Sequence, residues 1–121
     1  MDTTPEEMSA ARDFHAAYGE DYPDPVGDEF DLYFQVTSEI LWPKVWLNPG
    51  LDAKTRSLCV VAALTALGRP QVGRHVRAAL ANGASKDEIG QLLTLMAFYT
   101  GWPAAGAAIR QAQQIFREPP A

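Results

Sequence analysis

The hydrophobic positions of this chain recur at helical spacing, and no convincing period-2 alternation of the kind that strands show is present. Helix start and stop signals follow one another at regular intervals. The pattern therefore predicts an all-α protein, a compact helical domain of about six helices that occupies residues 1–121.

Prolines, glycines and capping residues set the expected helix boundaries. Pro43 should interrupt the helical pattern and leave residues 42–50 irregular. Ser85 and Glu88 have the spacing of a capping box. The predicted helices cover about 5–18, 28–41, 53–67, 70–82, 85–100 and 103–116; residues 20–27 are a predicted loop, so that 1–27 form an N-terminal helix and loop, and 117–121 are a predicted tail.

Two of these helices are apolar on every side. Apart from Thr65, residues 58–67 offer no polar face, and the apolar residues of 92–99 surround their helix in the same way. A helix that is apolar all round must be covered all round, and a chain of 121 residues has few elements for this purpose. We therefore expect a homo-oligomer, with a compact monomer as the alternative.

Charge and composition exclude several classes of partner. Fifteen acidic and ten basic residues give a net charge of -5, which opposes nucleic acid or anionic membrane as a partner. The longest apolar run, Leu58 to Leu67, is shorter than the roughly 20 residues that span a bilayer. The single Cys59 cannot form an intrachain disulfide, and the first residues lack the features of a signal peptide, so a cytoplasmic location is expected.

The best lead to chemistry is a cluster of Arg74, His75 and Arg77 on the helix expected from Pro70. His75 should flank the apolar stripe of that helix, and the two arginines should point away from the stripe. A functional histidine at the rim of a buried region is one interpretation, and a packed histidine bound to a backbone carbonyl is the other. The stripe consists of Val72, Val76, Ala79 and Leu80.

A second candidate is Arg56, which shares a helix stripe with Val60, Ala63 and Leu67. A buried guanidinium requires an anionic partner. That partner is either a protein carboxylate, such as Glu39, or the carboxylate of a substrate.

Four aromatic or basic residues are expected to contact substrate, with packing or surface roles as the alternative. They are Lys44 and Trp46 in the irregular segment 42–50, and Tyr99 and Trp102 on either side of the helix-breaking Gly101. The sequence has no metal-ligand spacing, no phosphate-binding glycine loop and no nucleophile elbow, so no metal or cofactor is expected.

Three segments carry a resemblance to a known family: LDAKTRSL at 51–58, GRPQVGRHVRA at 68–78 and YTGWPAA at 99–105. In order and spacing they resemble the carboxymuconolactone decarboxylase family, over about 34–116. The resemblance implies the helical fold of the alkylhydroperoxidase D-like superfamily, a hexamer or trimer, and decarboxylation without cofactor or metal. Reductases of that superfamily use a CxxC pair, whose positions fall on Gly68 and Gln71 here, so thiol peroxidase activity is not expected.

By the same resemblance, His75 is the catalytic acid or hydrogen-bond donor, Arg56 orients an acidic substrate, and 4-carboxymuconolactone is the expected substrate. The sequence departs from the family pattern at Lys44, Gln91 and Leu95, where members typically have a glutamate, an acidic residue and a histidine. These departures keep two alternatives open. One is a cofactor-free isomerase, cyclase or lyase acting on another acidic or polyketide-like substrate, and the other is a non-catalytic binding or assembly protein.

Overall fold

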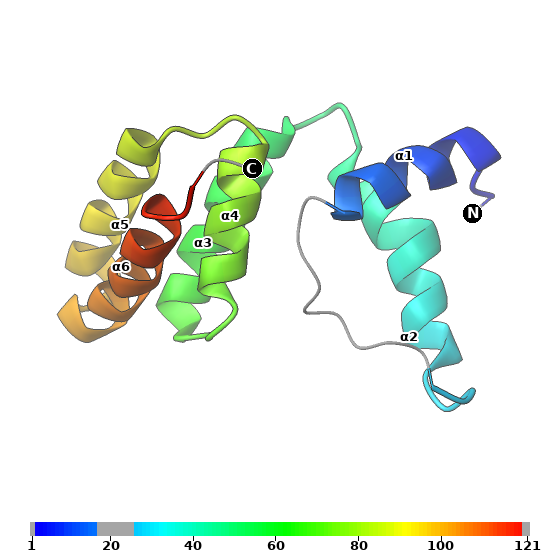
Figure 1. Cartoon of the computed structure of the whole chain (residues 1–121). Coiled ribbons are helices and arrows are strands. Elements are labelled where there is room, and N and C mark those ends of the chain that lie inside the picture. Colours follow the sequence, from blue (N-terminus) through cyan, green and yellow to red (C-terminus); the bar gives the residue numbers. More distant parts are fainter. Residues whose placement is uncertain (1, 17–25, 120–121) are drawn as a thin grey trace. The chain divides into compact units, whose positions relative to one another are not determined.

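The computed structural model describes residues 2–16 and 26–119, and of residues 15 and 16 the backbone alone. Within these residues every regular element is a helix, which confirms the all-α prediction (Figure 1). The elements are α1 (Pro5–Ala16), α2 (Asp31–Val36), the π-helix η1 (Thr37–Trp46), α3 (Ala53–Leu67), α4 (Val72–Ala81), α5 (Lys86–Thr100) and α6 (Trp102–Phe116).

The chain forms two compact units, residues 1–52 and residues 53–121, and each is described by itself. The expectation of a single domain over residues 1–121 stays a prediction. The predicted end of the first helix at Tyr18 and Gly19, and most of the predicted loop at 20–27, lie outside the described residues.

Local signals in the sequence explain the helix ends of the second unit. Gly68 ends α3 with φ +66°, a conformation that side chains other than hydrogen disfavour. At the start of α5, the Glu88 N–H donates to Ser85 Oγ and the Ser85 N–H donates to the Glu88 carboxylate, so the predicted capping box is confirmed. Helices α4 and α6 begin within two residues of the predicted Pro70 and Pro103 starts.

The second unit is a bundle in which α3 and α5 run in one direction and α4 and α6 in the other (Figure 1). Its core gathers apolar side chains from all four helices, among them Val61, Val76, Ile89 and Ala108. Polar contacts tie one end of the bundle together. Asn82 Nδ2 donates to Ser57 Oγ at 2.8 Å, Lys54 pairs with Glu88 at 2.9 Å, and Lys86 Nζ donates to the Phe116 carbonyl at 3.0 Å.

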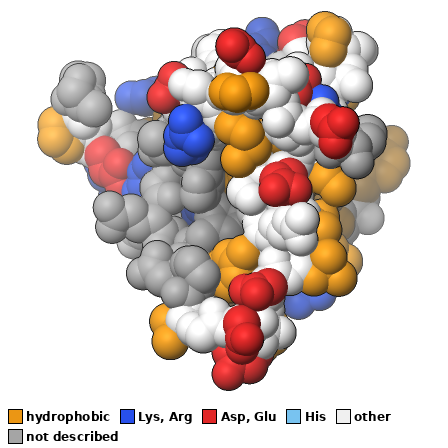
Figure 2. Space-filling model, turned by 90° about the vertical axis from the view of Figure 1, so that its right-hand side faces the viewer, with side chains coloured by type: hydrophobic (Ala, Val, Ile, Leu, Met, Phe, Trp, Pro, Cys, Tyr) orange, Lys and Arg blue, Asp and Glu red, His pale blue; other side chains and the backbone are white. Residues whose placement is uncertain are grey.

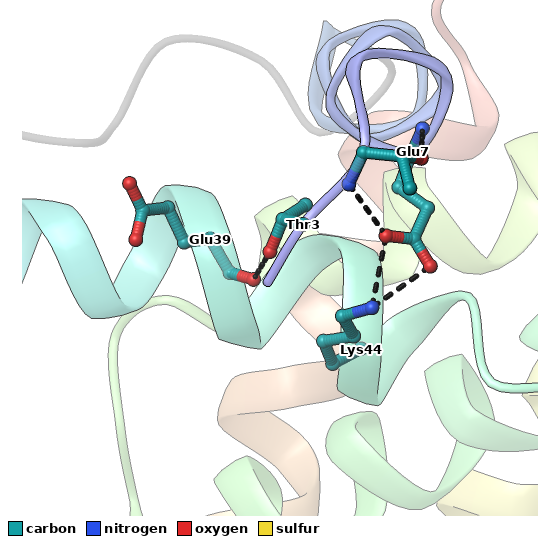
Figure 3. Close-up of polar contacts among 5 residues, drawn as sticks. Thr3, Glu7, Glu39 and Lys44 are labelled. Carbon is teal, nitrogen blue, oxygen red and sulfur yellow. Dashed lines mark hydrogen bonds and ion pairs between the residues drawn. The ribbon is translucent and has the colours of Figure 1, made fainter. Parts of the chain in front are cut away.

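In the first unit, α1 packs against η1 through aromatic and polar contacts. Trp42 and Trp46 are buried, and the Phe14 ring lies 5.9 and 5.6 Å from their ring centroids. Lys44 Nζ lies 2.8 Å from both carboxylate oxygens of Glu7 (Figure 3). The face of α1 that packs against η1 is therefore held by an ion pair in its first turn and by packed rings near its end.

The structure corrects the prediction that Pro43 interrupts the helix: residues 42–46 are helical, and of the segment 42–50 only residues 47–50 are irregular as predicted. The chain continues from α2 through Pro43 to Trp46 as a π-helix, in which the Leu47 N–H donates to the Trp42 carbonyl. Proline in an α-helix clashes with the carbonyl four residues earlier and cannot donate to it, whereas a π-helix uses wider i→i+5 turns. That earlier carbonyl belongs to Glu39, and it accepts a hydrogen bond of 2.8 Å from Thr3 Oγ1 instead (Figure 3).

Several large apolar side chains of the first unit are exposed to solvent. None of the residues of α2 is buried, and Phe30 and Leu32 are 68% and 72% exposed. Figure 2 shows hydrophobic side chains next to acidic ones on the face that it views. No helix within the described ranges is long and apolar enough to cross a membrane.

Candidate active site

The candidate site is built on the first turn of α4, which carries Arg74 and His75. Gln71 precedes this helix, and its side chain does not cap it. The Gly73 N–H donates instead to Oε1 of Gln111 on α6, at 3.0 Å. Because α4 packs against both α3 and α6, its first turn is fixed between two helices.

His75 is half-buried at the edge of the bundle core, and its Nδ1 atom is inaccessible to solvent. Burial lowers the pKa of His75 from 6.5 to about 4, with a further contribution from the positive charge of Arg74. The imidazole is therefore neutral at pH 7 in the protein alone. In that form one ring nitrogen donates a hydrogen bond and the other accepts one.

The structure corrects the prediction made for Arg74. This residue was expected to point away from the apolar stripe, but it is buried, with 8% of its surface exposed. The buried surface of α4 is wider than a single stripe because the helix has neighbours on two sides. The signal in the sequence is Ala78, a small residue on the same helix face four positions later, which is itself fully buried. Arg77 is exposed as predicted, and it pairs with Glu118 at 2.7 Å.

Arg56 and His75 lie at different levels of the bundle. The Asn82–Ser57 hydrogen bond joins the end of α4 to the start of α3, and the two helices run in opposite directions. Arg56 precedes Ser57 by one residue and His75 precedes Asn82 by seven. Because the helices are antiparallel, these offsets point in opposite directions and add up. At about 1.5 Å per residue, the two backbones are separated by roughly 12 Å along the bundle. The side chains of Arg56 and His75 therefore start from different levels, and a ligand that touches both has to lie between these levels.

Tyr99 and Trp102 lie where α5 turns into α6, and they are 79% and 65% exposed. Helices α4 and α6 run in the same direction, and Gln111 is beside Gly73. Trp102 precedes Gln111 by nine residues, and His75 follows Gly73 by two. The backbones of Trp102 and His75 are thus about 16 Å apart along the helix axes. Within one chain, the second unit does not bring these aromatic residues to His75.

Lys44 and Trp46 belong to the first unit, where both side chains are engaged. Lys44 pairs with Glu7, and Trp46 is 7% exposed in a cluster with Phe14 and Trp42. These contacts give the two residues structural roles in the first unit, and their expected contact with substrate stays a prediction.

Two other observations concern metal and thiol chemistry. Across residues 2–16 and 26–119, no group of three or more histidine, cysteine or acidic side chains is arranged to hold a metal ion. Cys59 is exposed on α3.

Two of the three positions at which the sequence departs from the family pattern lie on α5. Both of them, Gln91 and Leu95, are exposed.

The lowered pKa of His75 makes a prediction about stability. Its pKa is about 4 in the folded protein and about 6.5 in an unfolded chain, so the unfolded chain binds more protons between these values. The contribution of this group to the free energy of unfolding therefore falls as the pH drops through about 6.5, and it levels off below about 4. As the pH falls from about 6.5 to about 4, we therefore expect the unfolding free energy of the parent to decrease relative to that of His75→Gln.

Urea unfolding of both proteins at a series of pH values measures this difference. The carboxylates titrate in both proteins, so their effect largely cancels when the two curves are subtracted. A difference that stays constant with pH would mean that the folded protein does not disfavour the charged form of His75.

Comparisons with known proteins agree with this helical architecture. A family model described as "Carboxymuconolactone decarboxylase family" matches residues 31–114. The chain is 40% identical over 93 residues to a 4-carboxymuconolactone decarboxylase of Acinetobacter baylyi, which covers 75% of this chain and 69% of that protein. It is 31% identical over 87 residues to nitrosuccinic acid decarboxylase npaB of Metarhizium robertsii, covering 69% of this chain and 59% of that protein.

A third relative, an uncharacterized 15.0 kDa protein of Paracoccus denitrificans, is 41% identical over 83 residues, covering 66% of this chain and 62% of that protein. The matched segment thus spans less than two thirds of two of these three relatives.

Proposed function

The chain belongs to the carboxymuconolactone decarboxylase family, and from this membership we propose that it is a carboxy-lyase that needs no cofactor or metal. Its substrate in this proposal is a small cyclic or keto carboxylic acid, with 4-carboxymuconolactone as the first candidate and the breakdown of aromatic compounds as the setting. The observation that carries the proposal is the half-buried, neutral His75 beside the buried positive charge of Arg74.

The reaction breaks the bond between the substrate carboxylate and its neighbouring carbon. Carbon dioxide leaves, the electron pair flows into a conjugated carbonyl to form an enolate, and a proton is then added to carbon. The protein must stabilise the negative charge that develops on the enolate oxygen and supply the proton. A neutral imidazole N–H serves the first task without bringing a positive charge that would have to be buried in the empty site.

The substrate itself changes the state of His75. A carboxylate bound within a few ångströms favours the charged form of a neighbouring imidazole and raises its pKa from about 4. In the complex, His75 then becomes a better proton carrier. Arg56 holds an acidic group of the substrate in this proposal, and its long, flexible side chain spans part of the distance along the bundle to His75.

The test is turnover of 4-carboxymuconolactone by the purified protein, followed by release of carbon dioxide and by the stoichiometry of product formation. We expect one carbon dioxide per substrate consumed, and the same rate after treatment with a chelator. Nitrosuccinate and simple β-keto acids serve as a comparison panel. Consumption of a substrate without carbon dioxide release would favour an isomerase or cyclase, and no change in any of these acids would contradict an enzymatic function on this class of substrate.

We also propose that the protein assembles into a homo-oligomer, a hexamer or trimer. The support is the exposed apolar surface at the end of α5 and the start of α6, formed by Leu95, Phe98, Tyr99 and Trp102. Apolar patches of this kind on small proteins mark contact surfaces. In such an assembly, Tyr99 and Trp102 would contact a second copy, and this copy could bring them to a site that they do not reach within one chain.

A further inference from the structure

The first turn of α4 depends on another helix for its cap. The first N–H groups of a helix have no partner within it, and a side chain just before the helix usually satisfies one of them. Gln71 does not do so. The Val72 N–H and the His75 N–H donate to backbone carbonyls of Arg69 and Gln71, both at a long 3.4 Å. The Gly73 N–H has the shorter bond of 3.0 Å, and its acceptor is Oε1 of Gln111 on α6.

The same contact occupies the space that a Cβ atom at position 73 would take, so a side chain there would displace the Gln111 amide. Gly73 is buried, and a Cβ atom built on it would overlap Oε1 of Gln111. The backbone of α4 therefore approaches the Gln111 amide as closely as a residue without a Cβ allows. The hydrogen bond and the close packing act between the same two residues, so both hold the first turn of α4 against α6 at Gln111.

The residues that follow Gly73 are those of the candidate site. Arg74 is the next residue and is almost fully buried, and His75 comes one position later. A change in the position of Gly73 moves both side chains, because the helix carries them as one rigid turn. Displacements of about 1 Å in a catalytic constellation cost up to about 100-fold in rate.

We propose that Gln111 is a positioning residue: through Gly73 it holds the first turn of α4 and thereby keeps the side chains of the buried Arg74 and the half-buried His75 in position. Its effect on turnover rests on the proposed function of His75, but its effect on the environment of His75 does not. Gln111 is half-buried on α6, whereas Gln114 on the same helix is exposed. The chain thus offers a matched control for any substitution of Gln111.

The experiment compares Gln111→Met with Gln114→Met in the full-length protein. Methionine keeps the length and flexibility of glutamine but lacks its carbonyl acceptor. Amide hydrogen exchange reports on the Gly73 N–H, and a nuclear magnetic resonance titration of the imidazole reports on the pKa of His75. In Gln111→Met we expect faster exchange at Gly73 and a His75 pKa about one unit closer to the ordinary value of 6.5. Gln114→Met should leave both at the parent values.

Turnover is measured on the same proteins once the substrate is established. Gln111→Met should lower kcat by about 10- to 100-fold with a smaller change in KM. Gln111→Glu keeps an oxygen acceptor for the Gly73 N–H, so amide protection should persist in this variant. The proposal is overturned by a folded Gln111→Met that keeps parent values of Gly73 exchange and His75 pKa, or by loss of Gly73 protection in Gln111→Glu.

The two proposals fail in different ways. If the parent releases no carbon dioxide from any acid tested, the decarboxylase proposal fails, and the exchange and titration measurements still decide the role of Gln111. If the parent turns over and Gln111→Met matches it in all readouts, the decarboxylase proposal stands and Gln111 is not a positioning residue.

Discussion

His75→Gln is expected to lower kcat/KM on the order of 10²- to 10⁴-fold, with little loss of stability at neutral pH. Glutamine approximates the size of histidine and retains a hydrogen-bond donor, but it cannot accept and return a proton. Because His75 is only half-buried, the core of the bundle loses little packing in this variant. Steady-state turnover and urea unfolding of the same samples measure the two effects separately.

The pH dependence sharpens this experiment. The profile of kcat/KM reports on the free protein, where the pKa of His75 is about 4, and the profile of kcat reports on the complex, where a bound carboxylate raises that pKa. We expect the limb of the kcat profile that reports on His75 to lie at higher pH than the corresponding limb of kcat/KM, and this limb of kcat should disappear in His75→Gln. Arg77→Gln is the matched control, because Arg77 is exposed on the same helix. A His75→Gln variant that folds and turns over within a few-fold of the parent would make His75 a packing residue.

Local sequence signals determine much of the second unit. The ends of α3 and α5 follow from Gly68 and from the Ser85 capping box, since these residues act on their own backbone neighbours. The position of His75 on α4 follows from the apolar stripe in the same way. Each of these features depends on residues within one helical turn, which is the range over which a sequence pattern carries direct structural information.

The features that the sequence did not predict depend on packing between helices. The burial of Arg74 requires knowledge that α4 has neighbours on two sides, and the cap of Gly73 by Gln111 joins residues 38 positions apart. The continuation of η1 through Pro43 involves the Thr3 hydroxyl, which meets the Glu39 carbonyl from 36 positions away. The levels of Arg56 and Trp102 relative to His75 are likewise set by the register of the bundle and not by spacing along the chain.

The substitution Phe98→Glu is expected to dissociate the proposed homo-oligomer into single chains. Phe98 is 72% exposed in a single chain, and its ring meets Trp102 edge-on at 5.3 Å between centroids. Together with Leu95 and Tyr99 these rings form an apolar surface that a second copy would cover. Aromatic residues near the centre of such contacts each contribute about 2 kcal/mol or more, equivalent to about 30-fold in a dissociation constant. A buried glutamate adds the cost of desolvating its charge.

Light scattering coupled to size-exclusion chromatography measures the outcome. The parent should elute with a mass that is a multiple of 13.2 kDa, and Phe98→Glu should shift toward a single chain at micromolar concentration. Gln114→Glu is the control, because it adds the same charge at an exposed polar position of α6, in the last turn and far from Trp102. If the parent itself is a monomer across micromolar concentrations, the exposed rings of α5 and α6 do not join copies of this chain. In that case Tyr99 and Trp102 would also have no route through a second copy to the site at His75.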